Sequence, residues 1–478
     1  MEILKPTIGP VVGHTTSQQC RIFLRSKKSE SQTPHFSVVR YRVSHNPDWS
    51  EPVFNQLMPY NDMTAVMILD GLDDNTVYDY QAGWFSAETT LDNVALQSSG
   101  KLKWHSSTYV FKTATRNPKA ERNFIVGSCR YIHTLRGSGG MGLWPDLGDQ
   151  MFKVMFDKVT RKKMPIDAMF MVGDQIYADD LNLINPAAAL EDFLGRYRVA
   201  FSQEGIGKMM NNVPTYMILD DHEIEDNWPA KATPQDIETL YPAAIEAYSI
   251  YQCSHSPLYD ARKSGDISGA VIPEKFWYTV TNGVSDWFVM DVRTERKLHT
   301  TPPEMIGTVQ MAALLDTLKT SEARVKFVVT PVMFYPDLQS DHGDSWKSFP
   351  EQRNQILDYI RFNKIQNVVF VSGDVHCSLI SKLTHSAEPD FSVHTIVSSP
   401  LYKIPLLATY AYSYESDFIL NGLVSIVNDG AYNSQLISNV HSEDNFAYVS
   451  ANEKEVQVEF FGKNGQTLEK QPVVITLD

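Results

Sequence analysis

The segment from Ala168 to Tyr177 reads AMFMVGDQIY, and it decides the fold of the chain. Its first five residues, Ala168–Val172, form an apolar run of the length expected for a fully buried strand. Polar side chains follow at once, because Gly173 is succeeded by Asp174 and, three residues later, by Tyr177. A buried strand that ends directly at a carboxylate and a phenol indicates a sheet with a polar site at its edge.

Three further segments have the same arrangement of a buried strand with polar residues directly after it. They are Phe124–Gly127 followed by Ser128, Cys129 and Arg130; Thr215–Leu219 followed by Asp220, Asp221, His222 and Glu223; and Val368–Ser372 followed by Gly373, Asp374, Val375 and His376. In open α/β sheets, ligands collect just beyond the carboxyl ends of the strands. Four strands that end together would gather a thiol, a phenol, two imidazoles and several carboxylates in one small volume.

This set of side chains predicts a metal site. Unpaired carboxylates in one small volume repel each other, so the cluster needs cations to be stable. The nitrogen and sulfur ligands suit a transition metal, whereas the oxygen-rich side suits Ca²⁺, Mg²⁺, Mn²⁺ or Zn²⁺.

Each candidate residue also has an ordinary structural explanation when it is taken alone. Cys129 would be a small buried apolar residue, Asp174 a helix N-cap, and Tyr177 a core aromatic. His222 and His376 would be structural histidines with satisfied hydrogen bonds. The cluster reverses this balance, because four separate strands seldom end in such residues by chance.

From residue 122 onward the chain alternates strands with helices. Apolar residues recur at the helical spacing of three to four between Leu147 and Val159. Further helices are expected at Ala187–Ala200, Pro234–Gln252, Val309–Lys319 and Glu351–Asn363, and further strands at Trp287–Val292, Val325–Val329 and Val393–Ser398. The alternation predicts an α/β domain over residues 122–478, with a C-terminal β-hairpin around Lys463-Asn464-Gly465.

Residues 1–115 have a different pattern, with short alternating strands and polar turns. Cys20–Arg25, Phe36–Val43 and Val77–Tyr80 are examples, and no long helical pattern interrupts them. We therefore predict a small N-terminal β-sandwich domain. The polar segment Thr113–Arg122 is the expected linker to the α/β domain.

The composition is that of a globular chain with an acidic balance. The chain has 478 residues, of which 43% are hydrophobic, and at roughly 150 residues per domain it would form two or three domains. A formal net charge of −15 argues against nucleic acid and anionic membranes as partners, and the basic run Arg161-Lys162-Lys163 is too short to reverse this. No apolar run approaches the ~18 residues that a membrane span needs.

The cysteines and the N-terminus point to the cytoplasm. Cys20, Cys129, Cys253 and Cys377 are far apart and form no CxxC pair, so they do not indicate a disulfide framework. Met1–Gln19 lacks the charged leader and apolar core of an export signal. A cytoplasmic location is therefore expected.

At the four strand ends the sequence resembles the calcineurin-like metallophosphoesterase superfamily, and within it the PhoD-like alkaline phosphatases and phosphodiesterases. The superfamily motifs D-x-H, G-D-x-x-D/Y, G-N-H-E/D and G-H-x-H correspond to Ser128-Cys129-Arg130, Gly173–Tyr177, Asp220–Glu223 and Gly373–His376. The similarity extends to Asp291-Val292-Arg293 and Asp344-Ser345-Trp346, and to the β-sandwich before the catalytic domain. One metal-binding histidine block has no counterpart, and Thr330-Pro331-Val332 stands where it would fall.

The resemblance implies a fold and a set of metal ligands. The expected fold is α/β, a metallophosphoesterase-type β-sandwich flanked by helices (αββα) and preceded by a small all-β Ig/fibronectin-like domain. The implied ligands of Fe³⁺ are Cys129, Tyr177 and His376, and Asp174 would bridge two metals. Asp221 and Asp374 would bind a second divalent metal, with Ca²⁺ favoured over Zn²⁺ or Mn²⁺.

The resemblance also implies the reaction. The protein is expected to cleave phosphodiesters, phosphomonoesters or both, with a metal-bridging hydroxide as the nucleophile. His222 would act as the general acid that protonates the departing oxygen. Arg130 would bind a phosphate oxygen of the substrate, although it could equally pair with Asp179 or Asp180.

The residues alone leave two other functions open. A mononuclear iron oxygenase would use His222, His376 and one carboxylate as a facial triad, but the other carboxylates, the thiolate and the phenolate argue against it. A non-catalytic binding protein would use the β-domain on an inactive α/β scaffold. The loops 137–142, 182–186 and 340–344 surround the expected site, and neither they nor any other feature indicates the substrate or the oligomeric state.

Overall fold

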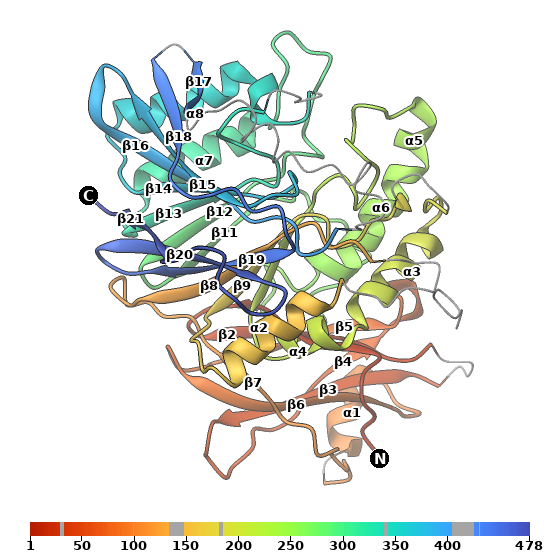
Figure 1. Ribbon diagram of the computed structural model, residues 1–478. Coiled ribbons are helices and arrows are strands. Elements are labelled where there is room, and N and C mark those ends of the chain that lie inside the picture. The colour runs from red at the N-terminus through yellow and green to blue at the C-terminus, as the bar shows by residue number, and fades with distance from the viewer. Residues whose placement is uncertain are drawn as a thin grey trace.

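The computed structural model describes residues 1–28, 33–98, 100–132, 148–180, 185–338, 343–403, 425–429 and 431–478 (Figure 1). The loop 137–142, and the parts 182–184 and 340–342 of the two other loops expected around the site, lie outside these ranges. Within the described part of the chain, no helix combines the length and the apolar character needed to cross a bilayer.

The first 115 residues form strands, as predicted, and these strands make two sheets. One sheet has the order β1 (Ile8–Thr15), β2 (Gln19–Arg25), β5 (Thr64–Asp70), and the other has the order β4 (Val53–Leu57), β3 (His35–Val43), β6 (Val77–Ser86), β7 (Tyr109–Lys112). Side chains of both sheets share one apolar cluster that includes Ile22 and Tyr80. A short helix, α1 (Leu91–Ser98), also lies in this part of the chain. The Ig/fibronectin-like assignment stays a prediction.

A second group of strands forms the sheet that carries three of the four predicted segments. Its order is β10 (Thr215–Ile218), β9 (Ala168–Val172), β8 (Arg122–Gly127), β19 (Asn445–Ala451), β20 (Glu455–Gly462), β21 (Val473–Thr476). The first three strands are parallel. The predicted C-terminal hairpin is confirmed, because Val456 of β20 pairs with Ile475 of β21 in antiparallel register.

The fourth segment belongs to a neighbouring sheet. The order of this sheet is β11 (Tyr278–Asn282), β12 (Ser285–Val289), β13 (Val325–Val329), β14 (Val368–Ser372), β16 (Glu388–Val397), β15 (Leu379–His385), β18 (Tyr432–Leu436), β17 (Ser425–Asp429). Strands β12, β13, β14 and β16 run parallel to one another.

The core lies between these two sheets. Phe124 and Phe170 of the first sheet meet Trp287 of the second, at ring-centroid distances of 4.7 and 3.8 Å. Along β9, Phe170 and Val172 face this shared cluster, while Met169 and Met171 face the opposite side and are equally buried. Burial on both faces explains why the strand is a continuous apolar run.

Helices cover the outer faces of both sheets (Figure 1). The first sheet packs against α2 (Gln150–Thr160), α3 (Leu190–Phe201), α4 (Glu204–Met210) and α6 (Leu240–Tyr248), and the second against α7 (Thr308–Thr320) and α8 (Pro350–Phe362). The mixed α/β class predicted from the sequence is confirmed. The αββα classification would account for these contacts, and it stays a prediction.

Two helical segments differ from the sequence expectation. The helix predicted over Pro234–Gln252 is divided into α5 (Pro234–Glu238), α6, and a π-helical turn at Ser249–Cys253. Helix α4 was not predicted, because its sequence EGIGKMM is short and contains two glycines. Its N-terminus is stabilised from outside, since the backbone N–H groups of Gly205 and Ile206 donate to the Asp149 carboxylate at 2.6 and 2.8 Å.

Two histidines at the contact between β1 and the π-helical turn should make folding stability sensitive to acid. The His14 backbone N–H donates to the His255 carbonyl at 2.7 Å. Burial, with a smaller contribution from the Arg21 charge, lowers the pKa of His14 to about 3. Burial and the Arg21 charge also lower the pKa of His255, to about 4, although a hydrogen bond to the backbone opposes the shift. The folded protein therefore binds fewer protons at these rings than the unfolded chain.

The stability from these two rings is fully present above pH 6.5 and is lost as the pH falls towards 4, by up to about 1.4 kcal/mol per pH unit for each ring. The measurement is urea unfolding at several pH values. His255→Gln should flatten the dependence, whereas the same change at exposed His299 should leave it unchanged. Equal slopes in all three proteins would contradict the prediction.

Candidate metal centre

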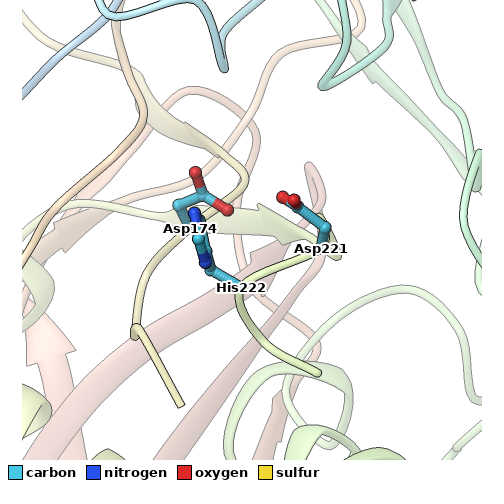
Figure 2. A group of neighbouring side chains, drawn as sticks. All are labelled: Asp174, Asp221 and His222. Carbon is cyan, nitrogen blue, oxygen red and sulfur yellow. The ribbon is translucent and has the colours of Figure 1, made fainter. Parts of the chain in front are cut away.

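The structure brings the four predicted segments to one place at the ends of β8, β9, β10 and β14. Carboxylate oxygens of Asp174, Asp220, Asp221 and Asp374 lie within 4.8 Å of one another. A second close group consists of Asp174, Asp221 and a ring nitrogen of His222. Figure 2 shows Asp174 and Asp221 facing each other, with His222 beside them. Asp220 joins this cluster although the sequence analysis assigned it no role as a ligand.

The acidic cluster has unused ligand capacity. Asp174 Oδ1 and Asp220 Oδ2 are buried and accept no hydrogen bond from the described part of the protein, and Asp221 Oδ1 has only a 3.5 Å ion pair with Arg293 there. A buried carboxylate oxygen without a partner is costly. Oxygen atoms that converge in this way fit a cation, and they fit hard divalent ions best.

The electrostatics of the cluster favour the binding of a cation. Burial raises the pKa of Asp174 and of Asp374 well above the ordinary value, and neighbouring carboxylates raise it further. Burial raises the pKa of Asp220 to about 7, although the Arg293 guanidinium opposes the shift. A cation at this position would favour the ionised carboxylates.

A softer set of side chains adjoins the carboxylates. The Tyr177 hydroxyl lies 3.3 Å from His376 Nε2 and 3.4 Å from Asp174 Oδ2. Cys129 is tied to the same region, because its backbone N–H donates to the Gly173 carbonyl. Burial raises the pKa of the Cys129 thiol and of the Tyr177 phenol, and both groups would lose their protons only beside a strong cation.

Two hydroxyl groups hold the Cys129 sulfur. Ser399 Oγ donates to Cys129 Sγ at 3.1 Å, and Ser128 Oγ shares a hydrogen bond with it at 3.3 Å. Cys129 and His376 both lie outside the two close groups of His, Cys and acidic side chains.

The backbone at the site is unusual. Cys129, Asp174, Asp374 and His376 all adopt left-handed conformations, with φ between 51° and 66°. For non-glycine residues such conformations cost on the order of 1–3 kcal/mol each, and they gather at functional sites. Gly373 permits the strand ends to meet, since a Cβ there would lie 2.8 Å from the Val172 carbonyl oxygen and closer still to the Ser128 side chain.

The Asp179 carboxylate holds the His222 ring on the side that faces away from the acidic cluster. Nδ1 donates to the two Asp179 oxygens at 3.0 and 2.9 Å, so Nε2 is the ring nitrogen that remains for a ligand. The Tyr177 ring stacks on the imidazole at a centroid distance of 4.1 Å. Burial alone would lower the pKa of His222, but the carboxylates around it outweigh burial and raise the pKa well above its ordinary value.

The sequence analysis assigned no role to two further charged residues at the site, Arg293 and Asp344. Arg293 is fully buried, and its Nε donates to Asp220 Oδ1 at 2.6 Å. The other end of its guanidinium binds Asp344, which also accepts from Arg296 at 2.6 Å. The signal was present, because Arg293 and Asp344 lie in the two outlying segments that carry the resemblance.

Glu223 was read only as part of an acidic motif, and the structure gives it a positional role. Its carboxylate is fully buried and accepts hydrogen bonds from the backbone N–H groups of Asp174, Gln175 and Asp220, at 3.1, 2.6 and 3.0 Å. Gln252 Nε2 adds a fourth, at 3.2 Å. One side chain therefore ties the end of β9 to the end of β10.

The interpretation of Arg130 as a substrate ligand needs correction. Its side chain is fully buried, and its guanidinium donates to the backbone carbonyls of Gly148 and Ala200 at 3.1 and 3.0 Å. It lies over the Phe152 ring and 3.7 Å from Asp149, so the carboxylate shown beside it is Asp149 and not one of the two that the alternative named. A guanidinium directed into the core in this way packs the domain, so we assign it no contact with substrate.

Fold and site together define a mixed α/β protein with a buried candidate metal centre at its strand ends. Comparison with known proteins gives the same picture. Residues 143–458 match the PhoD-like phosphatase family. The chain is 25% identical over 258 residues to alkaline phosphatase D of Bacillus subtilis (strain 168), a match that covers 46% of this chain and 43% of that protein.

A solved structure of PhoD superposes with a TM-score of 0.70 at 18% identity, covering 98% of this chain and 89% of the other. At this identity the likeness shows the fold alone. The family match spans well over half of the residues, so the chain belongs to the PhoD-like phosphatase family.

Proposed function

We propose that the protein is a metal-dependent phosphohydrolase that cleaves phosphodiesters, phosphomonoesters or both. The observation that carries the proposal is the meeting of three buried aspartates, the half-buried Asp374 and a carboxylate-bound histidine at the strand ends. The family assignment favours this reaction over the iron oxygenase and the non-catalytic binding protein that the residues left open.

The side chains fit two different metal ions. Cys129, Tyr177 and His376, with Asp174, supply the softer donor set suited to Fe³⁺. Asp174, Asp221 and Asp374, now joined by Asp220, supply the oxygen set for a divalent ion, for which Ca²⁺ is favoured and Zn²⁺ or Mn²⁺ is also compatible. Such a pair of cations would neutralise the negative charge of a phosphate ester and would lower the pKa of the attacking water.

The remaining chemistry belongs to His222 and Asp179. With Nδ1 donating to Asp179, the imidazole presents Nε2 to the acidic cluster. The Asp179 carboxylate beside the ring raises the pKa of His222, which favours a proton on the imidazole. His222 therefore delivers a proton to the departing oxygen, and Asp179 fixes the ring orientation and stabilises its charge.

Elemental analysis of the protein as purified tests this proposal. We expect iron and a second metal, each near one equivalent per chain, and hydrolysis of bis(p-nitrophenyl) phosphate or p-nitrophenyl phosphate that is lost when a chelator removes the metals. Asp374→Asn should lower the content of the second metal, whereas Asp390→Asn, on an exposed side chain, should not. Protein that binds no metal and cleaves neither ester would contradict the proposal.

A further inference from the structure

A basic groove runs between α2 and the turn that joins β20 to β21. Its volume is about 430 Å³, and its basic lining residues are Lys153, Lys158, Arg161, Lys162 and Lys463. Figure 1 shows α2 beside the dark blue C-terminal turn. The short basic run of the sequence thus becomes part of a five-cation surface, because the fold adds a lysine from a segment three hundred residues away.

The groove is positively charged in a chain whose net charge is −15. Among the lining residues that the structure describes, Asp157 alone is acidic, and it already pairs with Arg161 at 3.0 Å. The exposed side chains of Lys162 and Lys463 form no ion pair within the described residues. Lys153 pairs with Asp149 at 3.8 Å, so the charge that remains for a ligand lies on Lys158, Lys162 and Lys463, of which Lys158 has Glu459 nearby and Lys463 has Asp444 nearby.

Part of the groove is already ordered. Lys158 Nζ lies 3.7 Å from the centroid of the Phe461 ring, which is buried on β20. This contact fixes the ammonium group between the helix and the hairpin. A lysine whose position is set by packing loses little side-chain entropy when an anion binds.

Helix α2 explains only part of this charge. Basic residues near the end of a helix interact favourably with its dipole, which accounts for Lys158, Arg161 and Lys162. The dipole does not account for Lys463, which comes from the β20–β21 turn, whereas Lys153 forms an ion pair with Asp149, four residues before it, at 3.8 Å. Lys463 thereby adds its charge to the basic end of α2, and an anion in the groove can contact both elements.

We propose that this groove binds a soluble anion that carries several phosphate groups. The positive charges lie on two separate elements, so a ligand with more than one anionic group can contact both, whereas a single phosphate reaches only part of the groove. The groove shares no residue with the candidate metal centre, and this proposal does not depend on the proposed catalytic function.

Calorimetric titration of the full-length, metal-loaded protein with inorganic tripolyphosphate tests the proposal. Lys158→Gln/Lys162→Gln/Lys463→Gln should weaken binding at the groove by about tenfold or more, and raising the salt concentration should weaken it in the unmodified protein. The control, Lys5→Gln/Lys28→Gln/Lys103→Gln, removes the same charge from exposed lysines elsewhere and should change binding less than twofold. Binding at the metal centre is common to all three proteins.

The double variant Lys162→Gln/Lys463→Gln leaves the packing of Lys158 intact and guards against a folding defect. It should also lose affinity, by about threefold or more. Equal binding by the groove variants and the unmodified protein would overturn the proposal, as would an equal loss in the control. Loss of binding to phosphatidylglycerol vesicles without any loss of tripolyphosphate binding would overturn it as well, and would show that the groove contacts a membrane.

Discussion

His222→Gln is expected to lower kcat for an alkyl phosphodiester by about 10²- to 10⁴-fold, the usual contribution of a positioned general acid. An alkoxide is a poor leaving group, so its departure depends on a proton delivered from Nε2. Glutamine has no group that can donate a proton in this way and regain it. Metal content should stay near that of the unmodified protein, because neither proposed ligand set requires His222.

The choice of substrate separates a general acid from a merely structural histidine. A nitrophenolate ion departs without protonation, so His222→Gln should slow a nitrophenyl ester much less than an alkyl ester. A structural role would lower both rates by the same factor. The control is His299→Gln, on an exposed ring, which should leave both rates unchanged. Equal losses on the two esters would remove His222 from the role of general acid.

Asp179→Asn tests how the imidazole is positioned. The amide oxygen can still accept from Nδ1, so the ring keeps its orientation but loses the negative charge beside it. The pKa of His222 should fall, and the alkaline limb of the rate profile should move to lower pH, because the Asp179 carboxylate is the leading cause that raises this pKa. A profile that does not move would contradict this coupling.

The sequence predicts the positions of the strand ends well, because that information is local. Ala168–Val172 is buried on both faces, and the apolar run shows this directly. The residues after each strand are then placed by topology, since β8, β9 and β10 are parallel neighbours. The meeting of Asp174 with Asp374 required β14 to belong to a second sheet, which the alternation of strands and helices did not indicate and only the family resemblance implied.

What the sequence could not show depends on contacts between distant segments. The place of Arg130 in the motif suggested a substrate ligand. In the fold its side chain is directed into the core, because it donates to the carbonyl groups of Gly148 and Ala200. Helix α4 depends on the Asp149 carboxylate, more than fifty residues earlier in the chain. In both cases the deciding hydrogen bond joins residues that no local pattern connects.

Glu223→Gln is expected to disrupt the metal centre although Glu223 belongs to neither proposed ligand set. The two carboxylate oxygens accept from three backbone N–H groups and one amide. Glutamine has the same shape but replaces one acceptor oxygen with an NH₂ group, which would face a backbone donor. A buried N–H left without an acceptor costs about 1–3 kcal/mol, so a loss of stability of that size is expected.

The same change should loosen the metal ligands, because the two backbone segments that Glu223 joins carry Asp174 and Asp220. We expect the affinity for the second metal to fall at least tenfold, as measured by competition with a calibrated chelator, and urea unfolding to give the loss of stability. Glu225→Gln, the same substitution two residues further on at a half-buried side chain, is the matched control and should alter neither quantity. Full metal affinity in Glu223→Gln would show that the strand ends hold their geometry without this carboxylate, and the left-handed conformations at Asp174 and Asp374 would then have to be maintained by strand packing alone.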